Sequence, residues 1–548
     1  MSKEQLKKYF NSLGLAILAG FFIVSVVMVI RNHGGMDVVL SSNTKVITFA
    51  HWQLEDGFRE GFDEAIAEYE KCKAEQGIKV KVNQVAIPVR GYSQWYLTQL
   101  IGGEPADVIE IIGSSDIQNQ YMVSLAPFIG LKNPWNIGTP LENHSWRDSF
   151  IDDMLSTFDQ TYSDFFGVCI FMHTIRVYVN MDLYEKACGT SRLPETVTEW
   201  LASCRQINEY GREINKPLIP IGVRGFDKGT LGQLLSDYNS QMNAGLANNG
   251  SPYNYAVNSS EIFRQVNAAQ LERGKLLRPY ELVNEIGQYF AEGFSAIDLE
   301  QTKYLFSSGN VCYFIDGTYN AWSLVNNSPF RVAVIKMPEL DGGHSLGRGA
   351  VGRVSELGAG IGGKFGVTKK SKHQDIALDF LMFITSYKIN KMTMVEHCKW
   401  MSSLKHVEYE GLMKSFEPVS NTNYIPIRIP FDLGTYSRSR NLQRVERNII
   451  KNDPNPGFSF WDGFLKDRPM IIDELKETIH GVQRNLWVMD ATRSALSYGL
   501  EESPDDEFLQ LRGNINLEGI IGRWRILDEQ NDIISELGKL EEINRHGN

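Results

Sequence analysis

Two short motifs in a glycine-rich stretch between Asp341 and Gly366 contain the residue types of known enzyme sites. GHSLG (343–347) fits the G-x-S-x-G pattern of a serine hydrolase, in which Ser345 would be the nucleophile. GAGIGGK (358–364) fits the start of a phosphate-binding loop, and its first six residues also fit G-x-G-x-x-G. Each motif needs a particular strand and helix around it, so the neighbouring sequence tests both.

Neither motif has the neighbours that its chemistry needs. A nucleophile elbow follows a strand directly and precedes a helix, but the apolar run RVAVIKM ends at Pro338 and no helical pattern follows Ser345. A phosphate loop needs Ser or Thr after its lysine and a helix beginning there, whereas Phe365 follows Lys364 and FGVT is typical of a strand. We therefore predict no catalytic residue here, and we interpret the stretch as a flexible surface or cleft-edge loop.

Other residue types do not indicate a metal, cofactor or nucleic-acid site. The ten histidines are scattered without an HExxH motif, so we predict no metal and no cofactor. The net charge of −11, with no long basic run, argues against nucleic acid as a partner. Cys188 and Cys204 are the nearest plausible disulfide pair in an oxidising compartment, and free thiols are the alternative for all six cysteines.

The N-terminus has the pattern of a membrane anchor. Lys3, Lys7 and Lys8 precede an uncharged run over 13–30, which spans roughly 27 Å as a helix, close to the roughly 30 Å core of a bilayer. Residues 1–32 are therefore predicted to be a cytoplasmic stub and single-pass transmembrane helix, with the bulk of the chain periplasmic or extracellular. A signal peptide is the alternative, although no good small-x-small cleavage site follows. Residues 33–43 are a polar linker.

The body of the chain has the periodicity of an α/β protein. Strand-like 45–52, a helical pattern over 57–77, alternating 78–87, a helix over 93–103 and apolar 106–112 give a βαβαβ order, which indicates a parallel or mixed sheet covered by helices. The order recurs later, so two α/β units are expected. Capping patterns are present at Thr196–Glu199 and Ser371–Gln374. Polar helical stretches are expected over 471–500 and 517–543. The last is expected to pack back onto the body, and binding of a partner is the alternative.

A series of motifs carries a resemblance to a known family. In order, these are TFAHW, IKVKVNQVAIPVRGYSQWYLTQLIGGEPADVIEI, VYVNMDLYEKACGTSRLPETVTEWLASCRQI, LFSSGNVCYFIDGTYNAW and FGVTKKSKHQDIALDFLMFITS. Together they resemble the family 1 extracellular solute-binding proteins, sugar-binding receptors of ABC importers that include maltose-binding protein. The resemblance covers most of 44–410. The chain departs from the family in its predicted anchor, in Cys312–Tyr313–Phe314 where Ala-Met is usual, and in its tail after about residue 420.

The resemblance implies a two-lobed, type II-like periplasmic-binding-protein fold with a hinge between the lobes. FFGV (165–168) stands where the chain usually crosses between lobes. The implied divisions are 44–165 for the first part of lobe 1, 166–331 for lobe 2, 332–388 for the return to lobe 1, 389–460 for lobe 2 or a C-terminal part, and 461–548 for a helical extension.

The resemblance also implies a ligand site where strands run out into loops. Pyranose faces stack on aromatic rings, and sugar hydroxyls need carboxylate, amide or Arg partners. Trp52 and Trp322 also fit core aromatics, Asp116 also fits a helix N-cap, and Asp107 fits a residue that holds its loop. The predicted ligand-binding residues are Trp52, Gln53, Ser114, Ser115, Asp116, Arg224, Asp316, Tyr319, Trp322 and Arg348.

The implied function is that of a membrane-anchored receptor that passes a small-molecule solute, a sugar or oligosaccharide, to ABC permease subunits. A sensory or adaptor protein that reuses the fold is the alternative, motivated by the anchor and the helical tail. A carbohydrate-active enzyme is a third hypothesis.

Overall fold

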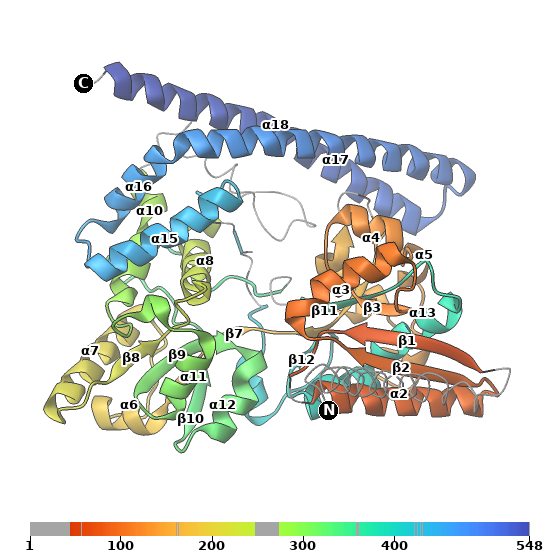
Figure 1. Ribbon diagram of the computed structural model, residues 1–548, viewed down its shortest axis with the longest axis horizontal. Coiled ribbons are helices and arrows are strands. Elements are labelled where there is room, and N and C mark those ends of the chain that lie inside the picture. Colours follow the sequence, from red (N-terminus) through yellow and green to blue (C-terminus); the bar gives the residue numbers. More distant parts are fainter. Residues whose placement is uncertain are drawn as a thin grey trace, which may run out of the picture.

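The computed structural model describes residues 44–546 except for 56, 160, 161, 163, 247–272, 358–360, 421, 423, 425, 428 and 430. Two α/β lobes lie side by side, and two long C-terminal helices run across both (Figure 1). The predicted anchor and linker (1–43) lie outside the described residues. Of the helices that are described, none combines the length and the apolar character needed to cross a membrane.

Lobe 1 is built on a mixed sheet. Among the described residues it has six strands in the order β12-β6-β11-β3-β1-β2. β1 pairs in parallel with β2 and β3, and β11 runs antiparallel to both β3 and β6. The strands are β1 (Lys45–His51), β2 (Val80–Ala86), β3 (Val108–Glu110), β6 (Val168–Met172), β11 (Ile361–Val367) and β12 (Met401–Ser402). The predicted βαβαβ order is therefore confirmed.

The two faces of this sheet are covered by different helices because successive strand residues point to opposite sides. Phe49 and Val108 pack under α2 (Phe58–Glu75) and α13 (Gln374–Ile384). Their neighbours Ala50 and Ile109 pack under α3 (Val89–Gly102) on the other face. The predicted apolar stripe of α2, with Phe58, Phe62, Ile66 and Tyr69, is buried.

Lobe 2 contains a second mixed sheet in the order β10-β7-β9-β8. Its strands are β7 (Ile175–Asn180), β8 (Ile219–Gly222), β9 (Val311–Gly317) and β10 (Val332–Ile335). One face packs under α6 (Met181–Cys188), α7 (Val197–Glu213), α8 (Gly229–Asn243) and α10 (Arg273–Gly287). The other packs under α11 (Leu299–Ser307) and α12 (Ala321–Asn327).

The lobe boundaries differ from the predicted ones. β6 is fully buried in the sheet of lobe 1, so the first crossing is at 173–174 and not at FFGV. β10 pairs with β7, so the return to lobe 1 begins near β11 and not at residue 332. Cys398, Trp400 and Leu404 pack in the lobe 1 core, although 389–460 was assigned to lobe 2. Short apolar strands have similar sequences in both lobes. Only their hydrogen-bonding partners show to which lobe each strand belongs.

A buried arginine fastens the region where the lobes join. Arg176, at the start of β7, donates two hydrogen bonds to the carboxylate of Glu356, with N–O distances of 2.7 and 3.0 Å. It also donates to the backbone carbonyls of Ser415, Phe416 and Glu417. These partners come from the two other connections between the lobes in the described chain. The Arg176 guanidinium therefore holds the three connections together.

The C-terminal part is helical, as predicted for 471–500 and 517–543, and it has two further helices that were not predicted. It contains α15 (Thr435–Lys451), α16 (Pro456–Lys466), α17 (Arg468–Glu502) and α18 (Glu507–His546). Val445 of α15 and Phe460 of α16 belong to the lobe 2 core. The predicted packing of the last helix onto the body is confirmed, because Ile533 and Leu537 of α18 reach the same core.

Of the two predicted helix caps, one is confirmed. Thr196 caps α7 by accepting a hydrogen bond from the Glu199 backbone N–H. Ser371 does not cap α13, whose N-cap residue is His373. The Ser371 hydroxyl instead donates to Asp107 at 2.5 Å, and Asp107 also accepts from the Thr48 N–H at 2.8 Å. Asp107 thus has the loop-holding role expected from its position.

All six cysteines are free. Cys188 does not pair with Cys204, which is fully buried in the lobe 2 core. The free-thiol alternative is confirmed.

Candidate functional site

The lobe 1 half of the candidate site lies at the carboxyl ends of β1 and β3. These parallel strands pair Ala50 with Ile109, so the residues that follow them meet at the same edge of the sheet. The backbone N–H of Trp52 donates to Glu110 at 3.1 Å, and the side-chain amide of Gln53 donates to the other Glu110 oxygen at 2.6 Å. The Trp52 ring packs edge-on against Tyr92, with 4.8 Å between ring centres. Trp52 is half-buried and Gln53 is buried, so a ring and an amide adjoin a buried carboxyl group.

Glu110 is the central residue of this half, and the sequence analysis did not single it out. Its side chain is completely buried, and burial raises the pKa of its carboxyl group to about 8, although the hydrogen bonds from Gln53 and Trp52 oppose the shift. One signal was available, since Glu110 is the only charged residue in the apolar run VIEII. A buried acid without a structural ion pair is a candidate for function.

Ser114, Ser115 and Asp116 lie at the start of α4 (Ser115–Tyr121), a short distance beyond β3. Ser114 occupies the N-cap position without a side-chain hydrogen bond, and Asp116 is in the first turn, so Asp116 is not the N-cap. The Asp116 carboxylate accepts a hydrogen bond from the Tyr162 hydroxyl at 2.8 Å. It also lies 3.8 Å from the guanidinium of Arg484 in α17. Ser114 and Asp116 are exposed.

The lobe 2 half brings together Arg224, Asp316 and Tyr319. Arg224 follows β8, Asp316 ends β9, and these strands are parallel. Asp316 is buried and accepts hydrogen bonds from the Gly317 N–H at 2.8 Å and the Asn320 amide at 2.6 Å. A Cβ on residue 317 would overlap the Tyr319 ring, so glycine at this position allows the ring to fold back beside Asp316.

In the lobe 2 half, neighbouring groups of opposite charge oppose the pKa shifts that burial causes. Burial raises the pKa of Asp316, while hydrogen bonds from Tyr319, Gly317 and Asn320 and the charge of Arg224 act in the other direction. Burial lowers the pKa of Arg224, but nearby Tyr319, Asp227 and Asp316 outweigh burial and raise it overall. The Nε atom of Arg224 lies 3.1 Å from the Asp227 carboxylate. Arg224 therefore remains a cation beside the buried Asp316.

Trp322 and Arg348 are exposed residues of lobe 2. Trp322 is 46% exposed on α12, and the Lys399 ammonium lies 5.6 Å from its ring centre. The side chain of Arg348 is exposed, and its backbone carbonyl accepts a hydrogen bond from Arg278 at 2.7 Å. The loop that carries Arg348 packs on lobe 2 through hydrogen bonds such as that between the Val351 N–H and the Gln241 carbonyl.

The described residues of the two enzyme-like motifs lack the neighbouring elements that the enzyme sites would need. Ser345 is exposed in a turn, and no helix follows it. Lys364 lies in the middle of β11, where its ammonium donates to the Gln118 side chain at 2.8 Å and the Thr157 carbonyl at 3.3 Å. The end of the glycine-rich stretch is thus a strand and not a loop. Within the described part of the chain, His, Cys, Asp and Glu side chains form no metal-binding group of three or more.

Comparison with known families identifies the fold. The model of the bacterial extracellular solute-binding protein family matches residues 53–391, which is more than half of the chain. The chain belongs to this family. The match includes both halves of the candidate site except Trp52, and it ends before α15, so the C-terminal helices lie beyond the family's matched region.

Solved structures of the family share its two-lobed architecture. The apo-form of RafE from Streptococcus pneumoniae is 15% identical, with a TM-score of 0.53, over 78% of this chain and 98% of that chain. The GacH receptor of Streptomyces glaucescens, whose structures include complexes with acarbose and a homolog, is 16% identical, with a TM-score of 0.51, over 78% and 98%. A structure from the study of xylan utilization by Caldanaerobius polysaccharolyticus is 13% identical, with a TM-score of 0.52, over 77% and 99%.

At these sequence identities, the similarity to the solved structures establishes the fold and not the ligand. A search of curated proteins by sequence found no match.

Proposed function

We propose that this solute-binding protein is an extracytoplasmic receptor for a sugar or oligosaccharide, which binds between the lobes at the carboxyl ends of β1, β3, β8 and β9. Open α/β sheets bind ligands outside the carboxyl ends of their strands. The proposed extracytoplasmic location agrees with the membership of the chain in the bacterial extracellular solute-binding protein family.

One observation carries the proposal: each half of the site places an aromatic ring beside hydrogen-bonding groups. Lobe 1 offers the Trp52 ring with Gln53 and Glu110. Lobe 2 offers the Tyr319 ring with Asp316 and Arg224. Sugars need this combination, because the faces of their rings are apolar and their hydroxyls need polar partners.

The family's solved structures support the same ligand class. They include RafE in complex with raffinose and a chitin oligosaccharide binding protein. Glu110, Asp316 and Arg224 do not identify which sugar binds, because proteins of one fold bind many different ligands.

Calorimetric titration of the purified protein with raffinose, chito-oligosaccharides and xylo-oligosaccharides tests the proposal. We expect one of these classes to bind, and Trp52→Ala to weaken its affinity about tenfold or more, as truncation of a buried aromatic contact does. Trp487→Ala is the matched control, because the Trp487 ring is 76% exposed on α17 and belongs to neither half of the site, and this variant should bind as the wild type does. Absence of binding by the wild type, or equal losses in both variants, would contradict the proposal.

Delivery to an ABC permease and anchoring by residues 1–32 are further parts of the proposal. Deletion of the gene should abolish uptake of the sugar identified by titration, and the protein should fractionate with membranes. A variant without residues 1–43 should fractionate with the soluble proteins.

The long C-terminal helices favour a second candidate, a sensory or adaptor role, because they lie outside the family's matched region. In that case the deletion strain takes up the sugar normally and loses a transcriptional response to it.

A further inference from the structure

The hairpin formed by α17 and α18 is rooted in lobe 2 by apolar contacts. Ile471 and Leu475 of α17 and Ile533 and Leu537 of α18 are buried in the lobe 2 core. Burial of large aliphatic side chains makes this end a permanent part of the lobe.

Farther from the root, the two helices of the hairpin pack on each other. Leu486 and Met489 of α17 form a separate apolar cluster with Ile520 and Leu527 of α18, and this cluster contains no residue of lobe 1. Asn516 joins the helices through a hydrogen bond from its amide to the Met489 carbonyl at 3.1 Å. The hairpin is thus a stiff arm whose cohesion does not depend on lobe 1.

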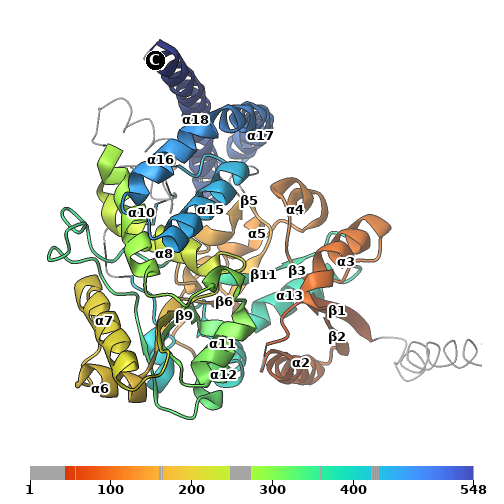
Figure 2. The ribbon, with the colours of Figure 1, turned by 60° about the vertical axis from the view of Figure 1, so that its left-hand side comes forward.

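The described contacts of the arm with lobe 1 include two ion pairs. Arg484 of α17 lies 3.8 Å from Asp116 in α4, and Arg512 of α18 lies 3.5 Å from Asp164. Asp164 belongs to the small hairpin of β4 (Phe158–Asp159) and β5 (Asp164–Phe165). Figures 1 and 2 both show the end of α17 and α18 that is remote from α16 close to α4 and the neighbouring lobe 1 elements.

A third arginine of the arm, Arg523 of α18, lies near the same acidic group. Burial lowers the pKa of Arg523, and the charge of nearby Asp159 opposes that shift. The Tyr162 hydroxyl, through its hydrogen bond to Asp116, connects the β4–β5 hairpin to α4. Three acids of lobe 1 therefore face three arginines of the arm.

The two ion pairs differ in their contact with solvent. The side chains of Arg512 and Asp164 are only 17% and 12% exposed, so salt screens this pair weakly. Those of Arg484 and Asp116 are 69% and 52% exposed, so this pair is weak and screened. The Arg512–Asp164 contact is therefore the less screened of the two, and the Arg484–Asp116 contact is the more easily broken.

We propose that the α17–α18 hairpin is an electrostatic strap: it is fixed in lobe 2, holds lobe 1 through Arg484–Asp116 and Arg512–Asp164, and thereby limits how far the lobes open. The crossing segments around Arg176 join the lobes at the hinge, and the strap joins them a second time through Asp116, beyond the carboxyl end of β3. This inference does not depend on which ligand binds.

Single-molecule fluorescence energy transfer on the purified full chain tests the strap without any ligand. Dyes are attached through unnatural amino acids at exposed Glu75 of α2 in lobe 1 and Glu213 of α7 in lobe 2. The wild type should give one narrow distribution of interlobe distance. Arg484→Glu with Arg512→Glu places like charges opposite both acids and should shift or broaden the distribution, with about threefold or more of the molecules in open states.

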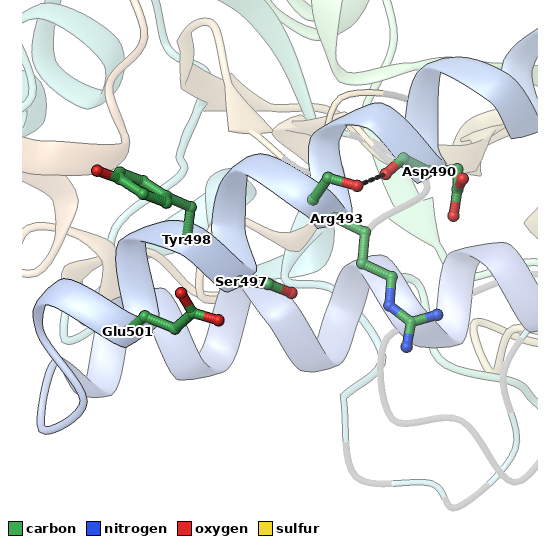
Figure 3. Close-up of a pocket in the computed structure, with 6 residues that line it drawn as sticks. Asp490, Arg493, Ser497, Tyr498 and Glu501 are labelled. Carbon is green, nitrogen blue, oxygen red and sulfur yellow. Dashed lines mark hydrogen bonds between the residues drawn. The ribbon is translucent and has the colours of Figure 1, made fainter.

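Arg493→Glu is the matched control. Arg493 lies on the same helix in a shallow surface groove lined by Asp490, Arg493, Ser494, Ser497, Tyr498 and Glu501. Figure 3 shows its guanidinium directed away from α17, and no ion pair joins it to another described residue. This variant has the same charge change as Arg484→Glu and should keep the wild-type distribution.

A charge swap keeps the test decisive if the double variant does not fold. Arg484→Glu alone changes an exposed residue, and it should increase the open fraction by a smaller amount. Adding Asp116→Arg should restore the wild-type distribution. The strap is refuted if Arg484→Glu and the folded double variant leave the distances unchanged, or if Arg493→Glu shifts them equally.

Discussion

Each half of the candidate site contains a buried carboxyl group, but the two groups have different partners. Glu110 in lobe 1 accepts hydrogen bonds from the neutral Gln53 amide and the Trp52 backbone. Asp316 in lobe 2 has neutral donors as well, and in addition the positive charge of Arg224 acts on it. Burial raises the pKa of both acids, and only in lobe 2 does a cation oppose it. The lobe 1 half is therefore expected to present neutral hydrogen-bonding groups, and the lobe 2 half charged ones.

The largest effect is expected for Glu110→Gln and should appear as a change in pH dependence. Because burial raises the pKa of Glu110 from 4.5 to about 8, the folded protein holds a proton between these pH values that the unfolded chain has released. The free energy of unfolding of the wild type should therefore fall as the pH rises from about 4.5 to about 8. Glutamine removes this dependence, so relative to the wild type the variant should gain on the order of a few kcal/mol across that range.

Urea denaturation of both proteins at pH 4.5, 6 and 8.5 measures this difference. Glu75→Gln, a substitution on the exposed end of α2, is the control and should leave the wild-type slope unchanged. If the free energies of unfolding of Glu110→Gln and the wild type change equally with pH, the Glu110 carboxyl group is not protonated in the folded state. The lobe 1 half of the site would then not present the neutral groups that distinguish it from the lobe 2 half.

A smaller effect of the same sign is expected for Asp316→Asn. Burial also raises the pKa of Asp316, so its negative charge lowers the stability of the folded protein near neutral pH, but Arg224 and the hydrogen bonds from Gly317 and Asn320 partly offset this cost. We expect a gain on the order of 1 kcal/mol in the free energy of unfolding, smaller than that of Glu110→Gln. Denaturation at pH 7 measures it. Asp227→Asn removes the more exposed acid near Arg224 and should give no gain; an equal gain in both variants would mean that the burial of Asp316 has no special role.

Tyr319→Phe separates the ring from the hydroxyl in lobe 2. The ring remains beside Gly317, while the hydroxyl no longer interacts with Asp316 and Arg224. Affinity for the bound sugar should fall about threefold to tenfold, as loss of one hydrogen bond does. Titration calorimetry measures this change, and Tyr304→Phe, on the exposed surface of α11, is the control. A loss as large as that of Trp52→Ala would contradict the contribution of a single hydrogen bond that is expected for this hydroxyl.

The smallest effect is expected for Trp322→Ala and should appear as a small loss of stability. It removes the contact of the ring with Lys399 and should lower the free energy of unfolding by about 0.5–1 kcal/mol. Thermal denaturation measures the change, and Lys399→Met should give a similar value because it removes the same contact. A larger loss in Trp322→Ala alone would indicate that the ring packs more widely than this contact.

The sequence predicted much of the fold because its signals are local. The apolar stripe of α2, the Thr196 cap and the strand–helix order of lobe 1 each follow from residues a few positions apart. The lobe boundaries were less predictable, because β6 and β10 are short apolar strands whose sheet is decided by partners far along the chain. Ser371 shows the same limit: its spacing fits a cap, but its hydroxyl is taken by the distant Asp107.

The candidate site was predicted in part. Trp52 and Gln53 were found because they follow a recognisable strand, and Asp316 and Tyr319 because they follow another. Glu110 was missed because its importance comes from burial and from the two donors that converge on it. Trp322 and Arg348 were predicted by chain order, and the structure shows both side chains exposed.

By itself, the sequence determined the α/β class, the family and the absence of neighbours that the two glycine-based enzyme motifs would need. These depend on short-range periodicity and spacing, which a chain carries whatever its tertiary fold. The tertiary structure decided which sheet each short strand joins, that Lys364 lies within a strand, and that Arg484 and Arg512 meet acids more than 300 residues away in the chain. Such contacts form only when the lobes and the helical arm are packed, because burial and long-range charge pairing have no local pattern.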